Sequence, residues 1–255
     1  MRAKCPECRA YTAVALGPEY ECHACGRTFA AGLVRVPRAW GRGGEAMAEA
    51  ASLPLPYPEA AVVAEGSLAE QSLALALELP ERPLVLGGCC CSHVGAVEAL
   101  SARHDRIAVV WLDAHGDLNT VESSPSGNEW GMPLRMLLDS AAVQPEDVAL
   151  VGARNLDPPE EEFIAAKGVG LGSEAVAPAL DGTAGAYVAV DFDALAEEEV
   201  APFMPEPGGL SLEEAEQVLA AVRDQRTVVG AGFSGLLPED RNVEPARRLA
   251  AALGL

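Results

Sequence analysis

The chain has 255 residues, of which 49% are hydrophobic and 22% charged, and its formal net charge is −20 at pH 7. These values describe a globular protein with one sizeable domain and room for a small accessory module. The acidity argues against nucleic acid as a partner, because phosphate binding needs clustered lysine and arginine. No apolar run approaches the roughly 20 residues of a membrane span, and the first residues lack the apolar core of a signal peptide. We therefore expect a cytoplasmic protein with no membrane contact.

Residues 1–31 contain two CxxC motifs, CPEC and CHAC, separated by thirteen residues. Each motif presents two thiolates on one side of a tight turn, and two facing motifs complete a tetrahedral site with four sulfur ligands. We predict a zinc ribbon with one structural zinc ion, whose binding supplies most of the folding free energy of so short a segment. A redox CxxC is the alternative, although redox motifs do not come in pairs at this spacing. The candidate ligands are Cys5, Cys8, Cys22 and Cys25.

Residues 32–57 are rich in proline and glycine, and we predict a linker there. From residue 58 onward, two kinds of segment alternate along the chain. Helical spacing is found at residues 60–79, 92–104, 132–141, 211–225 and 244–253, and apolar runs typical of buried strands at 82–88, 106–113, 147–154, 184–193 and 227–234. This alternation predicts an α/β domain over residues 58–255, with a mostly parallel sheet covered by helices on both faces. Ligands of such sheets bind at the carboxyl ends of the strands.

Acidic residues at alternate positions follow two of these predicted strands. The first strand leads into Asp113, His115 and Asp117, and the later one ends in Asp191 and Asp193. Alternate residues of an extended chain point to the same side, and clustered carboxylates repel one another unless cations are bound. The pattern predicts a site for two divalent metal ions bridged by carboxylates. A single pair of aspartates commonly caps a helix or turn, but that alternative accounts poorly for two such motifs.

Together, these motifs resemble those of the arginase/ureohydrolase superfamily. GGCCCSHVG (87–95) is similar to the family's GGDHSxxxG, DAHGDLNT (113–120) to DAHxDxNT, and SGNEWGMPL (126–134) to SGNxHGMPx; VGARNLDPPE (151–160) and VDFDAL (190–195) resemble two further family motifs. The resemblance covers most of residues 58–255. It implies a three-layer α/β sandwich, two divalent metal ions, usually manganese, and a hydroxide bound between them that attacks an amidine or guanidine carbon. Since family members usually form trimers or hexamers, it also implies a homo-oligomer.

The resemblance also implies roles for individual residues. Asp113 and Asp191 resemble the carboxylates that bridge the two metals. Asp117 matches a ligand of the first metal, and His115 and Asp193 match ligands of the second; His115 and Asp117 are also the candidate catalytic residues. The positions that recognise the polar tail of the substrate in arginases correspond to Asn119, Ser124, Ser126, Asn128 and Asp157. Ordinary loop chemistry is the alternative for this second set, because turns favour serine and asparagine.

Four departures from the family pattern bear on the metal and the substrate. Cys90 aligns with the family's first-metal histidine and Cys89 with its aspartate. We predict Cys90 as a ligand, and a thiolate shifts the preference towards zinc, iron or nickel. Trp130 replaces a proton-shuttling histidine; it cannot do acid–base chemistry, and we place it among the residues that contact the substrate. The aspartate–proline that follows VDFD in the family is absent, and no glutamate aligns with the one that pairs with a guanidinium group.

Two functions are consistent with these features. The first is a hydrolase of a non-peptide C–N bond in a small molecule of the amidine or guanidine type, other than arginine. The second is a family member that has lost hydrolysis and serves as a metal-binding or regulatory protein, with the zinc ribbon as its interaction module. We favour the hydrolase, because five of the six ligand positions of the dinuclear site are retained at the family's spacing.

Overall fold

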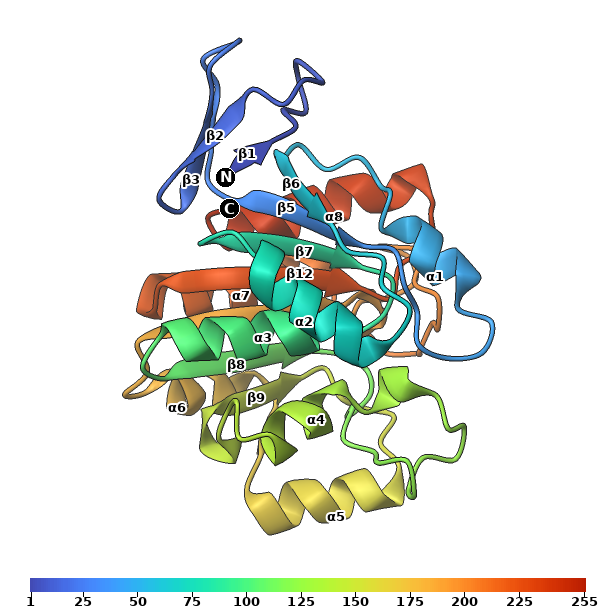
Figure 1. The fold of residues 1–255 in the computed structure, drawn as a ribbon. Coiled ribbons are helices and arrows are strands. Elements are labelled where there is room, and N and C mark those ends of the chain that lie inside the picture. Colours follow the sequence, from blue (N-terminus) through green and yellow to red (C-terminus); the bar gives the residue numbers. More distant parts are fainter.

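The computed structural model describes all 255 residues as an eight-stranded sheet flanked by helices and a separate four-stranded sheet at the amino terminus (Figure 1). The strand order in the large sheet is β10-β9-β8-β11-β12-β7-β5-β6, and all neighbouring strands are parallel. Helices α2, α3 and α4 cover one face, and α6, α7 and α8 cover the other (Figure 1). The predicted three-layer α/β fold with a parallel sheet is therefore confirmed.

The strands of the large sheet are short and strongly apolar. They are β5 (Gly32–Val36), β6 (Glu59–Val62), β7 (Pro83–Gly87), β8 (Ile107–Leu112), β9 (Val148–Val151), β10 (Gly170–Leu171), β11 (Gly185–Asp191) and β12 (Val228–Ser234). Every residue of β7, β8, β11 and β12 is buried. Helices on both faces account for this burial, because a parallel sheet covered on both sides excludes water from both sets of side chains.

The helices return the chain from the carboxyl edge of the sheet to its amino edge. They are α1 (Glu45–Ala50), α2 (Leu68–Glu78), α3 (Ser92–Arg103), α4 (Pro133–Asp139), α5 (Pro158–Lys167), α6 (Val176–Leu180), α7 (Leu212–Gln225) and α8 (Val243–Ala252). Residues 60–79, predicted as one helix, instead form the edge strand β6 and, after a break, helix α2. No helix is both long enough and apolar enough to cross a bilayer.

Residues 32–57, which we predicted as a linker, instead contribute to the main domain. Gly32–Val36 forms β5 between β7 and β6, and three of its residues are fully buried core positions: Leu33, Val34 and Val36. Arg35 is accommodated at this position because its guanidinium pairs with Glu59 at 2.6 Å. A strand of five residues that is followed at once by a proline gives too short a pattern to be recognised from periodicity.

The amino-terminal sheet is antiparallel and consists of β1 (Arg2–Ala3), β2 (Ala13–Leu16), β3 (Glu19–Cys22) and β4 (Thr28–Phe29). It is joined to the large sheet by a bridge between Lys4 and Glu59, at the first residue of β6. This small sheet therefore lies at the amino edge of the parallel sheet (Figure 1). Ligand sites of parallel sheets lie at the opposite, carboxyl edge.

Candidate metal centre and active site

Three strand ends bring the predicted ligands to one place on the carboxyl edge. The turn Asp113–Asp117 follows β8, Asp191 ends β11, and the cysteines follow β7. The glycine pair before the cysteines is required by close packing, since a Cβ on Gly87 would collide with Ser92 and one on Gly88 with the backbone of Arg38. Because neither Gly87 nor Gly88 carries a side chain, the turn after β7 can reach the end of β11, with the end of β12 between the two.

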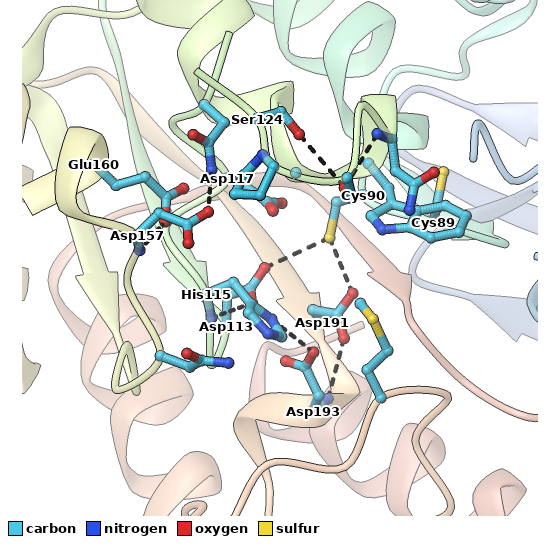
Figure 2. A pocket seen from close by; sticks show the side chains of 18 of the residues that line it. Cys89, Cys90, Asp113, His115, Asp117, Ser124, Asp157, Glu160, Asp191 and Asp193 are labelled. Carbon is cyan, nitrogen blue, oxygen red and sulfur yellow. Dashed lines mark hydrogen bonds and ion pairs between the residues drawn. The ribbon is translucent and has the colours of Figure 1, made fainter. Parts of the chain in front are cut away.

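The six predicted ligands surround two adjoining positions (Figure 2). Donor atoms of Cys90, Asp113 and Asp117 lie within 4.8 Å of one another, as do those of Asp113, His115 and Asp193. The Cys90 sulfur lies 3.0 Å from an oxygen of Asp191 and 3.6 Å from one of Asp113. Asp113 belongs to both groups. Two neighbouring cations that share the Asp113 carboxylate would fit this arrangement.

The buried position of this cluster disfavours the ionised form of its carboxyl groups. Burial raises the pKa of Asp191 to about 7 and that of Asp193 to about 6, and neighbouring carboxylates add to both effects. Burial lowers the pKa of His115, but hydrogen bonds and charges of Asp113 and Asp193 outweigh it and raise that pKa to about 12. The His115 Nδ1 atom lies 3.1 Å from Asp193 and 3.4 Å from Asp113. Bound cations would relieve this accumulation of negative charge.

Asp117 provides the sharpest test of whether the residues fit a cation. Its Oδ2 atom is buried and has no hydrogen-bond partner. Burial, together with the charges of Asp113 and Asp191, raises its pKa well above the usual range. Its backbone is left-handed, with φ of 51°, a conformation that aspartate adopts more readily than most residues. A buried carboxylate with an unpaired oxygen, in a cluster of other carboxylates and a thiol, fits a divalent cation.

The cluster forms the floor of a cavity of about 310 Å³. All the residues predicted to contact the substrate line this cavity: Asn119, Ser124, Ser126, Asn128, Trp130 and Asp157. Two of them contact each other directly, because the Asn119 amide donates to Asp157 at 2.8 Å. The Ser124 and Ser126 hydroxyls lie 3.4 Å apart. No lysine or arginine lines the cavity.

Trp130 forms part of the cavity wall. Its ring packs closely on Gly41 and Gly44, where an added Cβ would collide with it or touch it, and meets Phe203 edge-to-face with ring centroids 6.1 Å apart. These neighbours belong to the segment around α1 and to the loop after β11. The indole thus closes one side of the cavity with an apolar surface and brings no acid or base.

The arginase family model matches residues 46–254 of the chain. The chain belongs to the arginase family. The arginase of Bacillus caldovelox is 32% identical over 190 residues, which cover 63% of each protein, so the alignment spans less than two thirds of that relative's length. The structure of an arginase from Bacillus caldovelox superposes with a TM-score of 0.76 at 24% identity, covering 87% of this chain and 97% of that one. The proclavaminate amidino hydrolase of Streptomyces clavuligerus has the same fold, with a TM-score of 0.70 at 21% identity and coverage of 87% and 89%.

Glu206 and Ser234, which sequence analysis did not assign to the site, also contact this cluster, and two further buried residues, His93 and Tyr187, lie behind Ser234. Glu206 lies 3.5 Å from His115 Nε2 and accepts a hydrogen bond from Asn155 at 2.9 Å. The buried side chains of Ser234, His93 and Tyr187 lie on the core side of Cys90 and Asp191. The signal for Ser234 was a polar residue closing an otherwise apolar strand. Glu206 had no local signal, because it comes from an irregular loop thirteen residues after Asp193.

The four cysteines of the amino-terminal sheet also converge. Their sulfur atoms lie within 4.8 Å of one another, and the closest pairs are 3.9 and 4.0 Å apart. Both CxxC turns close with the same hydrogen bond: the amide of the residue after the second cysteine donates to the carbonyl of the first cysteine. The donating residues are Arg9 and Gly26, whose φ angles are 55° and 71°. This geometry suits a tetrahedral four-sulfur site. His23 between the second pair is exposed.

Proposed function

We propose that this protein is a metal-dependent hydrolase of a non-peptide C–N bond in a small molecule of the amidine or guanidine type. The observation that carries the proposal is the convergence of four carboxylates, one imidazole and one thiol at the floor of a single cavity, with one buried carboxylate oxygen left unpaired. Membership of the arginase family supports the same class of reaction.

The proposed ligands divide between two positions. Cys90 and Asp117 would hold the first cation and His115 and Asp193 the second, and Asp113 and Asp191 would be shared between them. Two divalent cations held there would supply a water molecule activated for attack at neutral pH. Manganese is the usual metal of the family, and the Cys90 thiol extends the choice to zinc, iron or nickel.

The chain's own groups bind the substrate and handle its protons. The carboxylate of Asp117 lines the cavity and has one oxygen free of hydrogen bonds, so it is placed to accept a proton from the attacking water. Glu206, 3.5 Å from His115 Nε2, would orient the imidazole while Nδ1 faces Asp193 and the second cation position. The polar tail of the substrate lies against the Asn119–Asp157 pair and the hydroxyls of Ser124 and Ser126, with Asn128 and Trp130 closing the cavity.

Arginine does not fit this site as a preferred substrate. Strand β12 ends in Ser234, and Glu239, the next acidic residue after it, is half-exposed and paired with Arg241. Glu160 lines the cavity, but both its oxygens accept backbone amide protons, from Leu118 and Asp157. Glu206 is engaged by Asn155 and His115. A guanidinium group at the metal centre would therefore be left without a carboxylate of its own, which costs binding energy.

The test is an activity screen of the metal-reconstituted protein against amidines, guanidines, ureas and acylated amines, with ammonia and urea as readouts. We expect turnover of a compound other than arginine, at a rate that disappears in the Asp191→Asn variant. Urea release from arginine at ordinary enzymatic rates, on the order of 10 per second, would contradict the substrate proposal. A screen with no turnover at full metal occupancy would contradict the enzymatic one.

A second candidate function is favoured by Trp130, which leaves the cavity without a proton-shuttling histidine. In that case the protein is a regulatory or metal-binding member of the family, and residues 1–31 serve as its interaction module. We also propose that Cys5, Cys8, Cys22 and Cys25 bind a structural zinc ion and that the protein forms a homo-oligomer. About three metal ions per chain with no turnover would favour the regulatory function over the hydrolase.

A further inference from the structure

A chain of buried polar side chains runs beneath the proposed metal centre. Tyr187 on β11, His93 on α3 and Ser234 at the end of β12 are each fully buried. The Tyr187 hydroxyl lies 3.0 Å from His93 Nδ1, and His93 Nε2 lies 3.2 Å from the Ser234 hydroxyl. The Ser234 oxygen lies 3.1 Å from the Cys90 sulfur and 3.3 Å from Asp191. Three elements thus place an unbroken line of hydrogen-bonding groups against two proposed ligands.

The fold makes room for this line of contacts. A Cβ on Gly232 would collide with both the His93 ring and the Tyr187 hydroxyl. The His93 ring also meets Trp111 edge-to-face, with centroids 5.3 Å apart, and the Trp111 indole N–H donates to Asp113 at 3.1 Å. The missing side chain of Gly232 and the packing of Trp111 therefore fix where the imidazole lies. The same packing orients a third proposed ligand, Asp113.

The direction of the hydrogen bonds follows from the donors available. Burial keeps His93 neutral by lowering its pKa to about 3, and a neutral imidazole has one donor and one acceptor. If Nδ1 accepts from Tyr187, Nε2 donates to Ser234, and the Ser234 proton is free to point at Cys90 or Asp191. In the other tautomer, the buried Tyr187 hydroxyl has no acceptor and the Ser234 proton is used on His93. The first arrangement leaves no buried donor unpaired, so it is favoured.

We propose that Tyr187, His93 and Ser234 are positioning residues that hold the Cys90 sulfur and the Asp191 carboxylate as metal ligands and thereby favour a thiophilic cation, such as zinc or cobalt, beside Cys90. The inference rests on the proposed metal centre and adds the residues that tune it. Partners of this kind fix the orientation of a ligand, and their loss typically weakens metal binding by 10- to 100-fold. None of the three touches the substrate cavity.

Cobalt binding tests this inference with a readout independent of catalysis. The full chain, with its amino-terminal zinc site loaded, is titrated with Co²⁺ while the sulfur-to-cobalt charge-transfer absorption is recorded. Subtracting the spectrum of Cys90→Ser isolates the contribution of the Cys90 sulfur. Tyr187→Phe removes one hydroxyl from the far end of the line, and Ser234→Ala removes the group that touches both ligands. Thr183→Val is the matched control, because it also deletes a buried hydroxyl, at the amino end of β11, where Thr183 donates to the Leu180 carbonyl at 2.7 Å.

We expect a Cys90-dependent band in the wild type and in Thr183→Val, with equal affinity for Co²⁺. Tyr187→Phe and Ser234→Ala should bind Co²⁺ about 10-fold or more weakly, with an altered band in Ser234→Ala and a smaller loss of affinity for Mn²⁺. Cobalt affinity and spectra within twofold of the wild type in both variants would overturn the positioning role while leaving the metal centre intact. A wild type that takes up no cobalt beyond the ribbon would overturn the proposed metal centre and this inference together. Thermal unfolding of each metal-free variant checks that it is folded.

Discussion

Replacing Asp117 by asparagine should stabilise the metal-free protein and weaken the metal-loaded one. The donor atoms of Asp117 and Asp113 lie within 4.8 Å in a fully buried site. At an effective dielectric constant of 20, two unit charges at that distance repel by about 3 kcal/mol. Because Asp117 can take up a proton instead of bearing the full repulsion, we expect a gain of about 1–3 kcal/mol, which is roughly 2–10 °C in melting temperature. Asparagine also suits the left-handed backbone at this position.

The gain should depend on pH in a defined direction. The pKa of Asp117 in the folded protein is raised, so its contribution to stability is complete at acidic pH and is lost as pH rises through the folded pKa. Asparagine has no such loss, and the advantage of the variant should therefore be larger at pH 8 than at pH 4.

With metal present, the sign should reverse. The variant lacks one anionic ligand, and a metal at 100 times its dissociation constant contributes about 2.7 kcal/mol to wild-type stability. The assay is thermal unfolding at pH 8 with and without Mn²⁺. Asp139→Asn is the control, because that carboxylate is exposed and pairs only with Arg135 across one helical turn, so its loss should change stability by no more than about 0.5 kcal/mol. An Asp117→Asn variant that is less stable than the wild type without metal, or equal stabilisation of both proteins by Mn²⁺, would contradict this prediction.

Three further predictions concern the metal sites. Cys90→Ser should reduce the metal content from about three ions per chain to about two, measured by atomic emission, and an unchanged content would remove Cys90 from the ligands. Mn²⁺ should raise the melting temperature more at pH 8 than at pH 5.5. Asp191 and Asp193, with pKa values of about 7 and 6, must lose their protons before they can bind a cation. Equal increases in melting temperature at the two pH values would contradict this prediction. Cys22→Ser should release the zinc and unfold residues 1–31 while the large sheet stays folded. Amide hydrogen exchange should therefore accelerate only in residues 1–31. Wild-type protection of these amides in the variant would argue against a structural zinc.

Part of the site could be predicted because its ligands form local patterns. Asp113, His115 and Asp117 alternate within five residues, as do Asp191 and Asp193, and each motif directly follows an apolar run. Strand ends of a parallel sheet meet at one edge, so their convergence follows from the fold class. The helix that begins after Asp157 also has a local signal, because prolines followed by Glu160 are typical of a helix start.

Other features have no local pattern and were decided by tertiary structure. Strand β5 belongs to the sheet only because β7 and β6 flank it, since five residues are too few to show a period. The amino-terminal sheet lies at the edge opposite the cavity because it is attached at the start of β6.

The line from Tyr187 through His93 to Ser234 joins residues 94 and 141 positions apart in the sequence. Hydrophobic periodicity shows which residues face the core, and it determined the layers of the fold. The local motifs determined the family resemblance and the candidate ligands. Periodicity carries no information on strand order, however, and strand order decides which buried polar groups meet. The ligands were therefore visible in the sequence, whereas the residues that hold them were revealed only by the folded structure.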